Sequence, residues 1–114
     1  MKSIIYLLFA CILLGSCVKS NPEKIRIIFD TDVGNDIDDV MAMAMLYNYA
    51  KNDKIDLLGI TISKANEYTV PFVDLLNRYY GYDSIPVGYV YEGKTPEKGR
   101  FLQQTLEAQK DGGQ

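Results

Sequence analysis

The apolar and polar stretches of the chain alternate in a way that predicts strands and helices in turn. Short apolar runs at 25–30, 55–62 and 85–90 are typical of buried strands, whereas the stretches at 38–50 and 67–80 have the length of helices. Continuous apolar strands separated by helices favour a parallel sheet with right-handed βαβ crossovers. We therefore predict an α/β fold.

Local sequence signals indicate where the predicted helices begin and end. Pro71 suits a first turn, so the second helix should begin near Thr69, and Gly81 fits the position just after its end. The run Val40–Tyr47 is apolar nearly all round, which predicts a helix buried on more than one side with methionines as core filling. After a Gly, Pro and Lys loop, an amphipathic helix is expected over 100–110.

The first residues have the pattern of an export signal. Lys2 precedes the apolar run Ile4–Leu14, which at eleven residues is shorter than the about 20 needed to span a bilayer. The segment Leu14-Gly15-Ser16-Cys17 resembles the lipobox of bacterial lipoproteins, which implies cleavage before Cys17 and lipidation of that residue. We expect a signal peptide over 1–16, a lipidated tether over 17–23 and a folded part over 24–114, anchored in the bacterial cell envelope only through its lipid.

Composition excludes several classes of protein. Cys11 leaves with the signal and Cys17 would be acylated, so no disulfide framework is available. The 12 Lys+Arg are scattered along the chain and are outnumbered by 15 Asp+Glu, so the charge pattern does not indicate nucleic-acid binding. Neither a Gly-x-Gly-x-x-Gly nor a Walker-type nucleotide loop is present.

Five of the fifteen acidic residues fall within ten positions directly after the first predicted strand: Asp30, Asp32, Asp36, Asp38 and Asp39. Two carboxylates about 4 Å apart repel by roughly 4 kcal/mol at an effective dielectric of about 20, so a cation or bound protons must offset the repulsion. Carboxylate oxygens suit Ca²⁺ or Mg²⁺, whereas transition-metal sites usually recruit His or Cys. Because the chain has no His, and no Cys after residue 17, we predict a hard divalent cation here.

The same residues carry a resemblance to a known family. Residues 29–39, FDTDVGNDIDD, resemble the opening signature of the inosine-uridine-preferring nucleoside hydrolases, in its longer Gly-x-Asp-x-Asp-Asp form. The run Leu57–Ile62 followed by Asn66, and the strand Ile85–Val87, are also similar to the N-terminal third of that family. The resemblance implies the Rossmann-like N-terminal half of the nucleoside hydrolase fold, and hydrolysis of ribonucleosides to ribose and free base.

The resemblance also implies roles for individual residues. Asp32 would be a calcium ligand and the base that takes a proton from the attacking water, and Asp39 would be a second calcium ligand. Asp38 and Asn66 would hold ribose hydroxyls. Two further residues would support the site, Asp30 from the end of the strand and Asp36 within the longer form. Whether the chain forms a homo-oligomer stays open.

The chain departs from the family in one respect. The family completes its calcium shell with a backbone carbonyl and an aspartate from later in the chain, and many members protonate the leaving base with a late histidine. None of these groups occurs here, and three parallel strands leave two open sheet edges. We therefore expect an N-terminal portion of a larger domain, inactive by itself.

Rival interpretations use the same aspartates. The run Ile27–Asp32 also resembles the strand-end Asp-x-Asp of haloacid-dehalogenase-type phosphatases, in which Asp30 would be the nucleophile and Asp32 an acid/base. Gly34 stands where that motif usually has Thr or Val, and the later aspartates have no role in it.

A non-catalytic metal- or sugar-binding lipoprotein is a third interpretation. An EF-hand is excluded, since Asn35 and Met41 occupy its Gly and Glu positions. Aspartates that merely cap a helix would explain one or two of the five.

Overall fold

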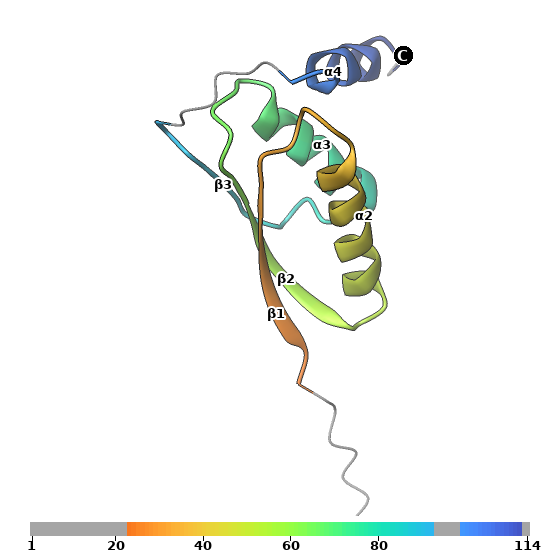
Figure 1. The fold of residues 1–114 in the computed structure, drawn as a ribbon. Helices are drawn as coiled ribbons and strands as arrows, with labels where there is room; N and C mark the ends of the chain where they lie inside the picture. Colours follow the sequence, from red (N-terminus) through yellow and green to blue (C-terminus); the bar gives the residue numbers. More distant parts are fainter. Residues whose placement is uncertain (1–22, 93–98, 113–114) are drawn as a thin grey trace, which may run out of the picture.

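The computed structural model describes residues 23–92 and 99–112, which form an α/β fold with one three-stranded parallel sheet and three helices (Figure 1). The strand order is β1-β2-β3, which confirms the predicted parallel sheet with helical crossovers. The elements in chain order are β1 (Ile25–Thr31), α2 (Asp38–Lys51), β2 (Ile55–Ile62), α3 (Thr69–Tyr80), β3 (Val87–Tyr89) and α4 (Leu102–Asp111).

Turn residues end the elements where the sequence predicts. Pro71 is the third residue of α3, where its missing N–H costs no helical hydrogen bond. Gly81 caps the helix in the left-handed conformation with φ 78°, and Asp53 turns the chain between α2 and β2 with φ 62°. The predicted strand at 85–90 is shorter in the structure, because only Val87–Tyr89 pair with β2.

Both crossover helices lie on the same face of the sheet, as right-handed connections between successive parallel strands require (Figure 1). The core lies between the sheet and these helices. Its fully buried members come from every layer and from the loop after β1: Val33, Met43, Tyr47, Ile60, Ile62, Phe72, Val73 and Leu102. Helix α4 joins this core through Leu102 and through Phe101, whose ring meets Phe72 edge-on at 5.6 Å.

The opposite face of the sheet is not covered by any helix of the described residues. Ile28 of β1 is 66% exposed there, and Leu58 of β2 is 37% exposed. Leu58 is the extra residue of a bulge in β2, since Ile27 pairs with Leu57 and Ile28 with Gly59. The sheet thus has one packed face and one open face.

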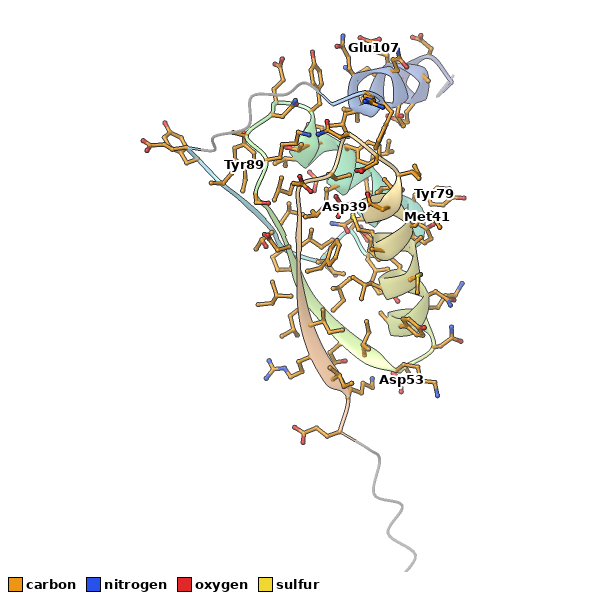
Figure 2. All side chains as sticks on the ribbon, viewed as in Figure 1. Asp39, Met41, Asp53, Tyr79, Tyr89 and Glu107 are labelled. Carbon is orange, nitrogen blue, oxygen red and sulfur yellow. The ribbon has the colours of Figure 1, made fainter. Side chains whose placement is uncertain are left out.

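The prediction that methionines fill the core along α2 is wrong in part. Met43 is buried at 1% exposure, but Met41 and Met45 are 60% and 55% exposed. Figure 2 shows Met41 on the side of α2 that points away from the sheet. The reason is geometric: only one stripe of a helix can face a three-stranded sheet, and Met43 and Tyr47 occupy that stripe.

The predicted signal peptide, Cys17 and most of the tether lie outside the described residues. Within residues 23–92 and 99–112, none of the helices is long and apolar enough to cross a bilayer.

Candidate functional site

The acidic loop begins at a rigid strand end. Thr31, the last residue of β1, is buried, and its hydroxyl accepts a hydrogen bond from the N–H of Val33 at 3.1 Å. Gly34 follows with φ 138°, a conformation that L side chains rarely adopt. Its carbonyl accepts a hydrogen bond from the N–H of Arg100 at 2.6 Å. The backbone just before α4 therefore fixes the position of the acidic loop.

Two of the aspartates form the first turn of α2. Asp38 and Asp39 lie there, and the Asp38 carboxylate accepts a hydrogen bond from the N–H of Asp39 at 2.9 Å. Negative charge at this position is favoured by the unsatisfied N–H groups and by the helix dipole. The backbone therefore gathers carboxylates at the carboxyl end of β1, where ligands collect in open α/β sheets.

Asp32 lies close enough to Asp39 for the two carboxylates to interact. Burial raises the pKa of the Asp39 carboxyl, the charges of Asp32 and Asp38 raise it further, and a hydrogen bond from the Thr31 hydroxyl acts in the opposite direction. Asp39 is the half-buried member of this group and Asp32 is exposed. A carboxyl that is desolvated and faces two like charges gains from any cation placed next to it.

Asp36 forms a second close pair. A hydrogen bond with Asp38 is the main reason that the pKa of Asp36 is raised, and the charge of Asp38 adds to it. Both side chains are exposed. Asp38 thus lies between Asp36 on one side and Asp39 on the other, in a single run of carboxylates around the start of α2.

Asp30 interacts with β2 and not with the other aspartates. Its carboxylate accepts a hydrogen bond from the Thr61 hydroxyl at 2.6 Å across the strand pair. It lines an open, mainly apolar hollow of about 450 Å³ at the carboxyl ends of the three strands, together with Ser63 and Tyr89. Asp30 therefore supports β1 and β2 rather than the run of carboxylates at α2.

Asn66 lies just after β2, at the same end of the sheet as the acidic loop. Its side chain is buried, and its Oδ1 accepts a hydrogen bond from the N–H of Tyr68 at 2.8 Å. The hydroxyl of Thr69 donates to the Asn66 carbonyl at 2.8 Å. These contacts fix the turn into α3, so the side-chain carbonyl of Asn66 has a structural partner already.

The chemical type of the donor groups supports calcium binding more strongly than the number of groups that converge. The donors are carboxylate oxygens, which calcium prefers. Burial raises the pKa of Asp39 and a hydrogen bond with Asp38 raises that of Asp36, and in both cases the charge of a neighbouring carboxylate, which a cation would offset, adds to the rise. Within the described part of the chain, no three or more His, Cys, Asp or Glu side chains converge as a metal cage would require. Asp32 and Asp39 are the pair that could hold the ion, with water or substrate oxygens completing its shell.

Two features escaped the sequence analysis. Lys64 is 1% exposed, and its Nζ has no hydrogen-bond partner among the described residues. The sequence carries a signal for this burial, because Lys64 continues the inward alternation of Ile60 and Ile62 two residues beyond the end of β2. Burying an amino group without a hydrogen-bond partner is costly, and Lys64 lies between the end of β2 and Asn66.

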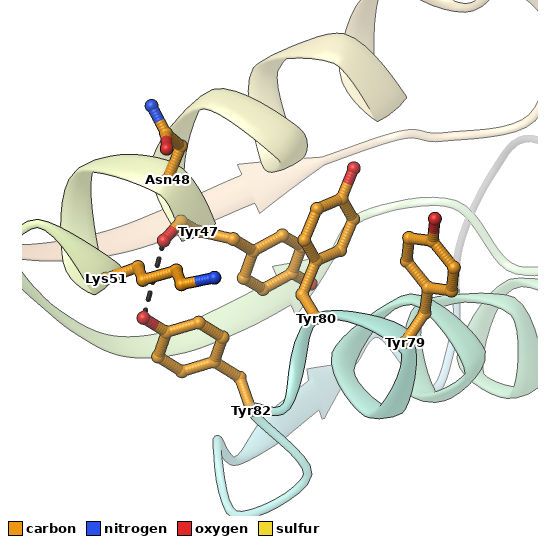
Figure 3. Close-up of a pocket in the computed structure, with 6 residues that line it drawn as sticks. All are labelled: Tyr47, Asn48, Lys51, Tyr79, Tyr80 and Tyr82. Carbon is orange, nitrogen blue, oxygen red and sulfur yellow. Dashed lines mark hydrogen bonds between the residues drawn. The ribbon is translucent and has the colours of Figure 1, made fainter.

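The second feature is a tyrosine-lined pocket of about 200 Å³ between the ends of α2 and α3 (Figure 3). The ring of Tyr47 stacks on Tyr80 at 4.7 Å and on Tyr82 at 5.5 Å. The Tyr47 hydroxyl donates to Asn77 at 2.6 Å, and burial raises its pKa. Tyr47, Tyr80 and Tyr82 therefore pack against one another in this pocket.

Comparison of the chain with protein-family models, with curated proteins and with solved structures finds no match. The arguments for function therefore rest on the residues and on the fold.

Proposed function

We propose that the chain carries the calcium- and ribose-holding part of a hydrolase that cleaves the N-glycosidic bond of ribonucleosides, of the inosine-uridine-preferring type. The observation that carries the proposal is the run of carboxylates from Asp32 to Asp39 at the carboxyl end of β1, with raised pKa values at Asp36 and Asp39. The signature FDTDVGNDIDD supports the family. The particular family is a proposal, and the α/β architecture is compatible with it.

The chain's residues have separate tasks in this reaction. Asp32 accepts a proton from the water that attacks the ribosyl C1′, and Asp39 is the second calcium ligand beside it. Asp38 accepts hydrogen bonds from the ribose hydroxyls, and Asn66 lies at the end of the neighbouring strand to hold the same sugar. A bound Ca²⁺ supplies a fixed positive charge that orients water and the sugar diol. The N-glycosidic bond breaks through an oxocarbenium-like state, which nearby carboxylates stabilise electrostatically, and the base leaves with the bonding electrons.

The test separates sugar recognition from chemistry. Inosine and 2′,3′-dideoxyinosine are titrated into the purified chain, with calcium and with EDTA, and binding is followed by NMR. Inosine should bind only with calcium, and the dideoxy analogue should not bind, because it lacks the diol. Equal binding of both nucleosides, or binding that ignores calcium, would refute the proposal.

Product assays discriminate the rival function. In a longer protein that joins this chain to the missing calcium-shell and leaving-group residues, release of free base from inosine or uridine supports the hydrolase. That release should be lost in Asp32→Ala with the fold retained by circular dichroism. Release of phosphate from a phosphate ester, with Asp30→Asn as the inactive variant, would instead support the phosphatase reading.

A further inference from the structure

Helix α4 contacts the acidic loop, residues 32–37, between two of its aspartates. Gly34 lies two residues after Asp32 and two residues before Asp36. Its carbonyl oxygen accepts a hydrogen bond from the N–H of Arg100 at 2.6 Å, and a Cβ built on Gly34 would lie 2.8 Å from Cδ1 of Leu102. Figure 1 shows α4 at the end of the sheet where this loop joins β1 to α2. The loop and α4 therefore meet through both backbone and side chain.

The contact is tightly packed on both sides. Leu102 is completely buried, and Val33, the neighbour of Gly34, is buried in the same core cluster. A Cβ built on Gly99 would lie 2.8 Å from the carbonyl oxygen of Gly34, so the two backbones also touch. Packed interiors leave few alternative arrangements for their side chains. A displacement of α4 must therefore move Gly34 as well.

The path of the loop sets the distance between the two candidate calcium ligands. Asp32 directly follows β1, whereas Asp39 belongs to the first turn of α2, and the loop that holds Gly34 joins the two elements. Calcium accepts oxygen ligands at about 2.3–2.6 Å, so its affinity depends on how the carboxylates are placed. A protein that holds its binding conformation for only a fraction of the time loses affinity in proportion to that fraction.

We propose that Leu102 is a positioning residue for the cation site. Docking of α4 through Leu102 holds Gly34, and with it the conformation of the acidic loop that takes the cation. The inference rests on the proposed function for the identity of that cation. Because coupling between two sites is reciprocal, binding of the cation stabilises the docked α4 by the same factor by which docking strengthens binding. Loss of the cation should therefore loosen α4, although none of the five aspartates belongs to it.

Calcium titration of variants tests the role of Leu102. Leu102→Ala should raise the calcium dissociation constant by at least about tenfold, which corresponds to a docked fraction of one tenth or less. Leu102→Met keeps most of the side-chain volume and should stay within about threefold of the wild-type value. The matched control is Leu76→Ala, because Leu76 of α3 also packs against the core but is not among the atoms nearest to Gly34. Equal dissociation constants for Leu102→Ala and Leu76→Ala would overturn the inference.

Hydrogen exchange in the wild-type chain tests the reverse direction and needs no variant. Calcium should slow exchange of the Arg100 N–H, compared with EDTA, by a larger factor than exchange of the Tyr82 N–H. That second amide donates to the Asn77 carbonyl at 2.7 Å, at the far end of α3. Saturable calcium binding with no added protection at Arg100 would overturn this inference and leave the proposed function standing. Absence of calcium binding in the wild-type chain would refute both.

Discussion

Replacing Gly34 with alanine tests how the acidic loop is held. Gly34 has φ 138°, and a Cβ built on it would lie 2.8 Å from Cδ1 and 3.2 Å from Cγ of Leu102, and 3.5 Å from Cα of Gly99. Leu102 is completely buried at the start of α4. The new methyl group therefore meets a side chain that has little room to move.

Two costs add in Gly34→Ala. Holding an L-residue in a sparsely populated backbone conformation costs about 1–3 kcal/mol. Overpacking a filled core costs about 1–3 kcal/mol more. The expected loss is roughly 2–6 kcal/mol, which is a large share of the about 5–15 kcal/mol by which single domains are usually stable.

Urea denaturation followed by circular dichroism measures this loss, with Gly81→Ala as the matched control. Gly81 also has positive φ, 78°, but a Cβ there would meet nothing within 4 Å, so its variant pays only backbone strain of about 1–2 kcal/mol. Adding Leu102→Ala to Gly34→Ala should remove the clash, so that the double variant is more stable than the two separate losses predict. If Gly34→Ala costs no more than Gly81→Ala, the contact between the loop and α4 is not as described.

Two further predictions concern the core. Tyr47→Phe removes the buried hydrogen bond to Asn77 and should cost about 1–3 kcal/mol of unfolding free energy at neutral pH, since the Asn77 carbonyl loses its partner. Because burial raises the pKa of Tyr47, the folded chain keeps a proton that the unfolded chain releases above pH of about 10, so stability falls as pH rises past that value. Tyr47→Phe should lack this part of the alkaline loss, and identical pH profiles would contradict the burial. Met43→Ala should cost about 2–5 kcal/mol and Met45→Ala about 0.5 kcal/mol or less in the same denaturation assay, and similar losses would mean that α2 presents another face to the sheet.

The fold followed from the sequence because its signals are local. Apolar runs of strand length, Pro71 and Gly81 locate the elements to within a few residues, and their alternation requires a parallel sheet. The exposure of Met41 and Met45 did not follow, because an all-round apolar helix has no polar face to show its orientation. That orientation is set by the width of the sheet beneath α2, which is a tertiary property.

The site was predictable in part. Carboxylates clustered directly after a strand predict that they lie together at its carboxyl end. In the structure Asp32 and Asp38 lie close enough to Asp39 for their charges to raise its pKa. Spacing alone could not show that Asp30 is bound to Thr61, since that contact depends on the register between β1 and β2. The roles of these residues in catalysis, and the calcium ion itself, stay predictions.

Isothermal titration of calcium into the purified chain tests the central claim most directly. We expect saturable binding to one site, lost in Asp32→Asn and in Asp39→Asn, and retained in Asp83→Asn, whose exposed carboxylate lies in the loop before β3. Absence of binding in the wild-type chain, or equal binding in all four proteins, would contradict a cation among the carboxylates at the end of β1.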